Sequence, residues 1–365
     1  MLTSTPRQYG DASLTEKLAL IASLFLHLPF ALAWALLISP FNPSNANKSW
    51  KRVLLEKISS FSCEQWSIAS FQWLLGDTYY AYVNWTKKNN LPVLADDIGE
   101  NARLLWVGRA RTDRVILYFH GGGFHFPLTS FGAGFWKHTL TELQDRGVDA
   151  GLVILNYSLA PAVSFPTPLK QAVRALEHLI SIGVSPENIQ ITGDSAGANL
   201  ALQLISHLLH PLDGIPHIKL SAPIRGVYLM SPWVSMPSLA SVISSTDSVV
   251  SGKAILGWGR QIMGEIPESQ RCYIEVGKAP KTWFKNAKTV VHRVLMTIGE
   301  EELLREDDVV FADQFCRDHD GARYIMQKNG VHVEPYFDFF DNGPNVSKSC
   351  VAVWDWLADG FKEDS

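Results

Sequence analysis

A short strand that turns through small residues into a helix constrains this chain more than any other feature. Residues 189–192 have the pattern of a strand, and residues 198–209 carry apolar side chains at helical spacing. Between them, Gly193 and Gly197 flank Ser195. Because the backbone is strained at the apex of such a turn, bulk at the flanking positions would clash. The pattern predicts a serine hydroxyl that is lifted out of the sheet and placed at a helix N-terminus, although ordinary Gly/Ser turns before helices match it too.

From about residue 100 onward, apolar strand-like runs alternate with helical segments. The expected strands are residues 103–107, 115–120, 151–156, 189–192, 225–230, 290–298 and 323–327. The expected helices are residues 130–146, 167–182, 198–209, 303–317 and 346–358. This alternation indicates an α/β fold with a mostly parallel central sheet flanked by helices. In such sheets, active sites lie at the carboxyl ends of the strands.

A glycine run follows the strand that ends near Phe119. The segment His120-Gly121-Gly122-Gly123-Phe124 has three consecutive glycines, so backbone N–H groups can approach a ligand with no Cβ in the way. Two such N–H groups, together with that of Ala196 after the serine, could hold an oxyanion. A merely flexible loop is the alternative, and the position directly after a buried strand argues against it.

An acidic segment and a histidine follow the last two strands. A carboxylate between residues 299 and 307 could orient a histidine, although most acidic groups there are expected to be solvated or to cap the next helix. His332 comes after the strand at residues 323–327 and would be the general base for Ser195. The chain order of serine, acid and histidine fits the nucleophile-elbow arrangement.

At this point the motifs resemble a known family. His-Gly-Gly-Gly-Phe at residues 120–124 and Gly-Asp-Ser-Ala-Gly-Ala-Asn-Leu-Ala at residues 193–201 look like the hormone-sensitive-lipase branch of the α/β-hydrolases. Asn-Tyr-Ser-Leu-Ala-Pro at residues 156–161 resembles its Asp-Tyr-Arg-Leu-Ala-Pro segment. The resemblance covers about residues 103–358. It implies an α/β-hydrolase fold, carboxylesterase-type acyl transfer, a Ser–acid–His triad and no cofactor.

The resemblance assigns roles residue by residue. Ser195 matches the nucleophile and His332 the base, although Val-Glu follows His332 where the family has Gly-Phe. The oxyanion donors would be the N–H groups of Gly122, Gly123 and Ala196.

The acid of the triad departs from the family pattern. The family has Asp in an Asp-x-Leu-x-Asp/Glu pattern, and the best match is Glu-Leu-Leu-Arg-Glu at residues 302–306. Glu302 is therefore the expected acid and Glu301 the fallback, because a longer side chain can still reach the imidazole. Asn156 and Ser158 also depart from the family, which affects local salt bridges but not the chemistry.

A long apolar segment precedes this domain. After a polar tail at residues 1–17, residues 18–41 contain no Asp, Glu, Lys or Arg. A helix of this length spans roughly 36 Å, enough to cross a bilayer core. We expect a single-pass membrane anchor, with the endoplasmic reticulum as the expected compartment. A cap helix is the alternative, since His27 and Pro29 weaken a spanning helix. The arrangement is similar to fungal membrane-bound steryl acetyl hydrolases and to hydrolases of secondary metabolism.

The anchor is expected to lead into an aromatic-rich cap and linker at residues 42–102, followed by a catalytic domain at residues 103–365. Together with an insertion at residues 235–285, the N-terminal region would cap an apolar pocket. Glycosylation patterns at Asn47, Asn84 and Asn345 would make this a glycoprotein if the domain is lumenal.

Charge and cysteine content exclude several classes of function. The formal net charge is −4 and no basic run occurs, so no nucleic-acid partner is expected. The four cysteines are widely spaced and form no pattern typical of a metal site. The expected partner is a small apolar ester, and the oligomeric state stays open.

The expected function is a serine ester hydrolase that acts on an apolar ester, such as an acetylated sterol or a secondary metabolite. A second enzyme class keeps the acyl-enzyme but transfers the acyl group to an alcohol or amine, or closes a ring. A third reading is a ligand receptor, because this branch includes plant hormone receptors that lack the histidine. The presence of His332 argues against that reading.

Overall fold

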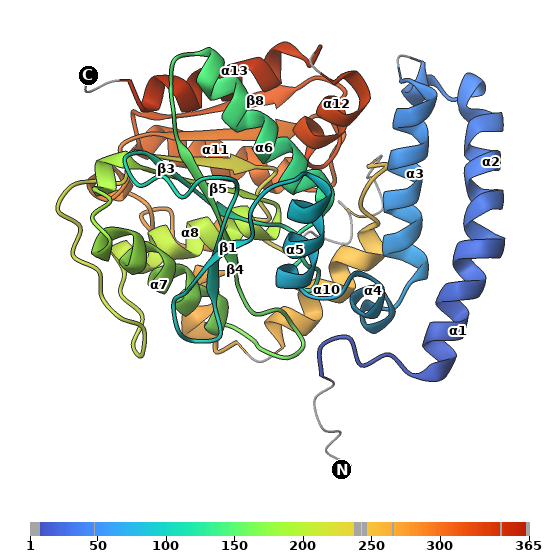
Figure 1. Cartoon of the computed structure of the whole chain (residues 1–365), viewed down its shortest axis with the longest axis horizontal. Coiled ribbons are helices and arrows are strands. Elements are labelled where there is room, and N and C mark those ends of the chain that lie inside the picture. Colours follow the sequence, from blue (N-terminus) through green and yellow to red (C-terminus); the bar gives the residue numbers. More distant parts are fainter. Residues whose placement is uncertain are drawn as a thin grey trace.

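An eight-stranded, mostly parallel sheet forms the centre of the protein (Figure 1). The computed structural model describes residues 8–46, 48–236, 242, 247–264, 266–343 and 345–362. The strands are β1 (Leu94–Asp97), β2 (Arg103–Trp106), β3 (Val115–Phe119), β4 (Gly151–Asn156), β5 (Ile189–Asp194), β6 (Gly226–Met230), β7 (Val294–Gly299) and β8 (Ala322–Gln327). Their order is β1-β2-β4-β3-β5-β6-β7-β8. The β1–β2 and β2–β4 pairs are antiparallel and the others parallel.

Helices cover both faces of this sheet, as the sequence predicts. They are α5 (Thr78–Lys88), α6 (Ser130–Asp145), α7 (Thr167–Ser181), α8 (Ala196–Leu209), α11 (Arg305–Asp318), α12 (Glu334–Asn342) and α13 (Lys348–Gly360). Buried side chains of α7, α8 and α11 form one core with the sheet, and those of α5, α6 and α13 form a second. Strand β1 joins the sheet from within the region expected to be cap and linker.

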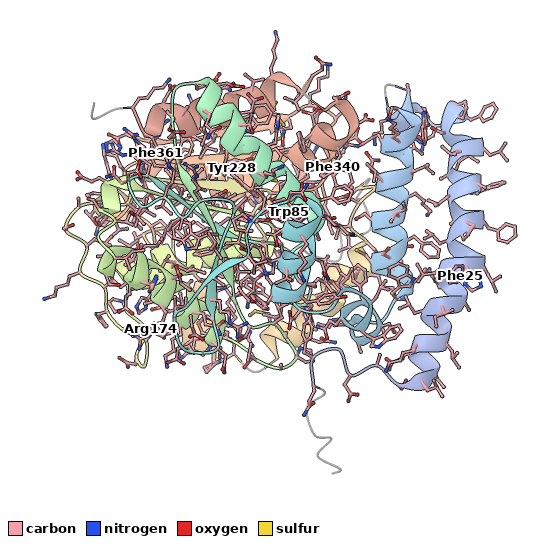
Figure 2. All side chains as sticks on the ribbon, viewed as in Figure 1. Phe25, Trp85, Arg174, Tyr228, Phe340 and Phe361 are labelled. Carbon is pink, nitrogen blue, oxygen red and sulfur yellow. The ribbon has the colours of Figure 1, made fainter. Side chains whose placement is uncertain are left out.

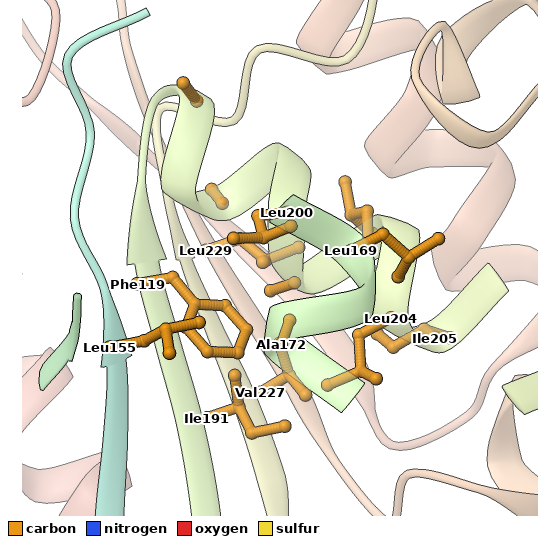
Figure 3. Packing of buried hydrophobic residues seen from close by; sticks show 14 of the residues in the cluster. Phe119, Leu155, Leu169, Ala172, Ile191, Leu200, Leu204, Ile205, Val227 and Leu229 are labelled. Atoms are coloured by element: carbon orange, nitrogen blue, oxygen red, sulfur yellow. The ribbon is translucent and has the colours of Figure 1, made fainter. Parts of the chain in front are cut away.

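The central strands are buried on both faces, which explains why they are apolar without interruption. Successive side chains of β3 point to opposite faces, so Phe119 lies in one core and Tyr118 in the other. Figure 3 shows the first core, where Phe119 and Ile191 from the sheet gather with Leu200 from α8. This packing fixes the carboxyl ends of β3 and β5 side by side.

Each strand and helix expected from residue 103 onward is present, with its ends shifted by a few residues. Helix α12 was not expected from the sequence. It has nine residues and starts directly after Val333, whose φ is 53°. A segment of nine residues is too short for apolar spacing alone to distinguish a helix from another short apolar run.

The apolar N-terminal segment is helical throughout. It comprises α1 (Leu14–Ala22), a π turn (Ser23–His27), α2 (Leu28–Ile38) and a 3₁₀ turn (Ser39–Phe41). Among the described residues, Leu14–Phe41 is the one helix whose length and composition allow it to cross a membrane. Many of its large apolar side chains are exposed, including Phe25, Phe30, Trp34, Leu37 and Phe41.

Helix α3 (Trp50–Gln65) lies between this outer helix and the rest of the protein (Figures 1 and 2). Figure 2 labels Phe25 on the outer helix. The indole Nε1 of Trp66 donates to Ser23 Oγ over 3.0 Å and so attaches the outer helix to the end of α3.

The insertion at residues 235–285 is described at residues 235–236, 242, 247–264 and 266–285. It contains α10 (Gly252–Met263) and 3₁₀ turns at Glu268–Tyr273 and Val276–Lys278. Of the three glycosylation patterns, Asn84 lies in α5 and Asn345 precedes α13, whereas Asn47 lies outside the described residues.

Candidate active site

Ser195 occupies the apex of the turn between β5 and α8. Its backbone has φ 52° and ψ −117°, a conformation that non-glycine residues rarely adopt. A Cβ on Gly193 would lie 2.4 Å from the Gly197 carbonyl, and one on Gly197 would lie 2.0 Å from Phe119 O. Both flanking glycines are therefore required by close backbone approach, which is the reason that the sequence suggested. The next strand supports the turn, because the Ser195 N–H donates to Met230 O over 2.9 Å.

The glycine loop after β3 packs directly against this turn. The Gly121 N–H donates to Asp194 Oδ1 over 3.0 Å, and a Cβ on Gly121 would lie 2.2 Å from Asp194 Oδ2. Gly122 and Gly123 follow with φ of 107° and 60°. Among the described residues, no hydrogen bond from the N–H of Gly122 or Gly123 is found. Because Ala196 begins α8, the three expected oxyanion donors belong to two segments in contact with each other.

Asp194 joins three elements beneath the serine. Its Oδ1 accepts from Gly121 of the loop, from the Tyr118 hydroxyl of β3 over 2.6 Å and from the Tyr336 hydroxyl of α12 over 3.0 Å. Burial raises the pKa of the Asp194 carboxyl, and these hydrogen bonds offset part of that increase. Asp194 lies within the sequence motif around Ser195, but the motif assigns it no role, since nothing in the chain order pairs it with Tyr118 or Tyr336.

His332 and Glu302 are adjacent in the structure. The two atoms His332 Nδ1 and Glu302 Oε2 are 3.3 Å apart, and each residue is 5% exposed. Burial lowers the pKa of His332, but the hydrogen bond to Glu302 and the charge of that carboxylate outweigh it, so the pKa is raised above 6.5. Glu302, and not Glu301, is the glutamate in contact with the imidazole.

Among the described residues, no hydrogen bond joins Ser195 to His332. The charge of Asp194, the residue next to Ser195, contributes to the raised pKa of His332. No hydrogen bond of the Ser195 hydroxyl is found among the described residues. Catalytic hydrogen bonds are often long in structures without substrate and shorten when it binds.

Comparison with known proteins identifies the family to which this chain belongs. The sequence profile of the alpha/beta hydrolase fold matches residues 116–335, more than half of the chain. The chain belongs to the alpha/beta hydrolase family. Its relatives place this hydrolase in the hormone-sensitive-lipase-like branch.

Curated relatives of this hydrolase include deacetylases and lipases. It is 28% identical to arylacetamide deacetylase of Bos taurus over 193 residues, which cover 47% of this chain and 46% of the relative. It is 30% identical to hormone-sensitive lipase of Homo sapiens over 165 residues, which cover 40% of this chain and 15% of the relative. The chain therefore spans less than half the length of these relatives.

Solved structures share its fold at low identity. An esterase/lipase from an uncultured bacterium has a TM-score of 0.56 and 20% identity, and the alignment covers 77% of this chain and 89% of that one. Carboxyl esterase 2 of the fungus Tuber melanosporum has a TM-score of 0.56 and 20% identity, with 74% and 85% covered.

Two further residues hold the histidine of this hydrolase, and sequence reasoning missed both. Ser231 has φ 46°, and its Oγ accepts from the Val333 N–H over 3.0 Å, which fixes the chain directly after His332. Asp247 is half-buried in the insertion, where its Oδ2 accepts from the Leu303 N–H over 3.0 Å and its charge raises the pKa of His332. The sequence assigns no role to Ser231, and no sequence motif marks Asp247.

A cavity of about 440 Å³ lies beside the glycine loop of the hydrolase. Its walls come from α4 (Ile68–Leu75), from α10 and from the loop after β4, and Phe124 links it to the glycine run. Ser195 is not part of its lining, so this cavity adjoins the candidate site and does not contain it. Within the described residues, no group of His, Cys, Asp and Glu could hold a metal ion.

Proposed function

We propose that this protein hydrolyses carboxylic esters through a covalent acyl-enzyme on Ser195. The observation that carries the proposal is the strained backbone of Ser195, with φ 52° at the N-terminus of α8 and the glycine loop packed against it. A non-glycine residue keeps such a conformation only where its surroundings enforce it, and such strain clusters at functional sites. The named activities of the relatives, esterases, lipases and deacetylases, support the same reaction.

In the proposed reaction, His332 removes the proton of Ser195 Oγ, and this oxygen attacks the ester carbonyl. Glu302 accepts the Nδ1–H of His332, which orients the ring and stabilises the imidazolium. The N–H groups of Gly122, Gly123 and Ala196 bind the oxyanion of the tetrahedral intermediate.

Collapse of this intermediate breaks the bond to the alcohol oxygen, which takes the proton from His332. A water molecule, deprotonated by His332, then attacks the acyl-enzyme and releases the acid.

The proposed substrate is an apolar ester, such as an acetylated sterol or a secondary metabolite. Support comes from the cavity beside the glycine loop, whose walls include Ile68, Phe165, Ile262 and Ile274. We propose that α4 and α10, from the N-terminal region and the insertion, are the parts of the cap that contact the apolar group. The names of the deacetylase relatives favour a short acyl group.

Hydrolysis of p-nitrophenyl acetate by Ser195→Ala tests the reaction. Loss of the nucleophile is expected to lower kcat by about 10⁴-fold or more. Ser181→Ala, at an exposed position in α7, is the matched control and should keep full activity. Full hydrolysis by Ser195→Ala would contradict the proposal.

A panel of acetylated sterols and other natural-product esters then tests the substrate, with Ser195→Ala as the blank. Adding a competing alcohol or amine separates hydrolysis from acyl transfer, because a transferase would form the new ester or amide in preference to the free acid. Failure of a fluorophosphonate probe to label Ser195, together with tight binding of an apolar ligand, would instead favour a receptor.

We also propose that residues 18–41 attach the protein to a membrane as a single-pass anchor, with the endoplasmic reticulum as the compartment. The support is the length of the helix and the exposure of its apolar side chains, among which Phe30 is 77% and Phe41 85% exposed. Exposed apolar surface of this extent is costly in water and favourable in lipid.

A further inference from the structure

A third carboxyl group lies behind the pair formed by His332 and Glu302. Asp308, in the first turn of α11, is fully buried and lies within hydrogen-bonding reach of the Glu302 carboxyl. Among the described residues, both carboxyl oxygens of Asp308 and Glu302 Oε1 have no hydrogen-bond donor. Three buried acceptor oxygens without a donor, at one place, require an explanation, because each would cost free energy if left unpaired.

One proton shared between the carboxyl groups of Asp308 and Glu302 would give these oxygens a hydrogen bond. Two ionised carboxylates have only acceptor oxygens, so they repel each other and cannot form a hydrogen bond. If one of them is protonated, it donates to the other, and the pair carries one negative charge. Glu302 Oε2 already faces the Nδ1–H of His332, which favours the ionised form at Glu302. Asp308 has no such partner, so the proton belongs on Asp308.

We infer that Asp308 is a neutral carboxylic acid that donates its proton to Glu302 Oε1 and thereby holds the Glu302 carboxylate against His332. Asp308 is thus a positioning residue, which acts through Glu302 and touches no substrate. The inference rests on the proposed function, since it assigns Glu302 as the acid of the triad.

The charges around the pair agree with a neutral Asp308. The charged groups that act on Asp308 are Glu302 and Asp307, both negative. Burial and the neighbouring Glu302 raise the pKa of Asp308 well above 3.8. His332 in turn faces Glu302, Asp247 and Asp194, so it is the cationic partner available to the cluster when it accepts the serine proton.

Two substitutions of Asp308 test whether its side chain donates a hydrogen bond or only fills the core. In Asp308→Asn the amide N–H can replace the carboxylic O–H, so kcat/KM for p-nitrophenyl acetate and its acid limb should stay close to wild type. In Asp308→Leu this donor is lost, so the Glu302 carboxylate accepts the Nδ1–H of His332 more strongly and favours the protonated imidazole. We expect kcat/KM to fall by about 10²-fold and its acid limb to move to higher pH.

Three results would overturn the inference. One is an Asp308→Leu protein with an unchanged rate and acid limb, which would make Asp308 merely structural. Another is an Asp308→Asn protein that loses as much activity as Asp308→Leu. The third is an acid limb that moves to lower pH in Asp308→Asn, because this would mean that a negative charge had been removed. Asp307→Asn, at a half-buried position one residue earlier, is the matched control.

Infrared spectroscopy tests the protonation without using activity. Wild type and Asp307→Asn should show a protonated carboxyl C=O band at pH 7 that Asp308→Asn lacks, and identical spectra for wild type and Asp308→Asn would overturn the inference. If Ser195→Ala kept full activity while the band behaved as expected, the proposed function would fail and the neutral Asp308 would stand. The two failures are therefore distinguishable.

Discussion

The position of the Ser195 side chain requires that its neighbours at 193 and 197 have no side chain. The turn closes only because Gly193 and Gly197 let backbone atoms approach to distances that a Cβ would prevent. The same holds where Gly121 meets Asp194. At the histidine, protonation depends on nearby charge, since Glu302 and Asp247 both raise the pKa of His332. Close backbone packing thus fixes Ser195, and charge sets the protonation of His332.

Gly197→Ala should distort the turn, because its Cβ would lie 2.0 Å from Phe119 O. Backbone cannot move aside as a flexible side chain can, so we expect a loss of about 3 kcal/mol in the free energy of unfolding. Urea denaturation measures this, and hydrolysis of p-nitrophenyl acetate should fall in parallel. Gly257→Ala in α10 is the control: a Cβ there meets nothing within 4 Å, so the protein should keep its activity and its stability. Equal stability of both variants would contradict the close packing.

Glu302→Gln should lower kcat/KM by about 10²- to 10⁴-fold, because the amide no longer stabilises the imidazolium. The pKa of His332 is raised mainly by Glu302, so the neutral base predominates only above a pKa that exceeds 6.5. Activity of the wild type should therefore rise as the pH passes the pKa of His332. In Glu302→Gln this pKa is lower, so the acid limb should move to lower pH. A pH profile of kcat/KM measures both effects.

Glu301→Gln is the matched control for this profile, since Glu302 is the glutamate that contacts His332. It should keep the rate and the acid limb of wild type. If Glu301→Gln lost activity and Glu302→Gln did not, the acid would be Glu301.

Among the elements, α3 and α12 are joined by a buried ionic network. Arg52 of α3 forms two hydrogen bonds with Glu334 at the start of α12, of 3.0 Å and 2.5 Å, and a third with Glu56. Glu56 also accepts from Ser248 Oγ over 2.6 Å, in the segment that carries Asp247. Because Glu334 is two residues after His332, one arginine connects the N-terminal region to the histidine turn and to the insertion.

Arg52→Met should destabilise the protein by about 3 kcal/mol, because it leaves the half-buried carboxylate of Glu334 without its cation and the buried carboxylate of Glu56 with Lys48 alone. Urea denaturation gives the size of the effect. As a comparison, Lys288→Met breaks an exposed pair with Asp320 and should change stability by less than about 0.5 kcal/mol. Similar losses in the two variants would mean that the Arg52 network adds nothing beyond a surface ion pair.

The whole molecule combines an α/β core that carries the candidate site with an apolar helix on its outside. Residues Leu14–Phe41 contact the rest of the protein mainly through α3 and α4, and their outer side chains are exposed. The helix thus adds no residue to the candidate site. We expect it to determine where the enzyme is located and to leave the chemistry unchanged.

Phe30→Arg combined with Leu37→Arg should release the protein from membranes after carbonate extraction. These side chains are 77% and 64% exposed, so the core should stay intact, whereas a charge within the bilayer costs about 3 kcal/mol. Arginine at Ile182 and Val310, exposed apolar positions on the catalytic domain, is the control and should leave the protein in the pellet. A wild-type protein found in the supernatant would exclude the anchor.

The sequence by itself determined the class of the fold, the order of strands and helices from residue 103 onward, and the turn at Ser195. These features depend on local periodicity and on glycines whose need is local, so they can be recognised along the chain. The places after β7 and β8 indicated a carboxylate between residues 299 and 307 and His332, and the family resemblance then selected Glu302.

Only the tertiary structure decided what surrounds those residues. It placed Glu302 in contact with the imidazole, buried Asp308 behind it, and brought Asp247, Ser231 and α12 to the same site. The physical reason is that burial and electrostatic contact arise between segments far apart in the chain. A carboxylate that will be solvated and one that will be buried beside a histidine have the same appearance in a sequence.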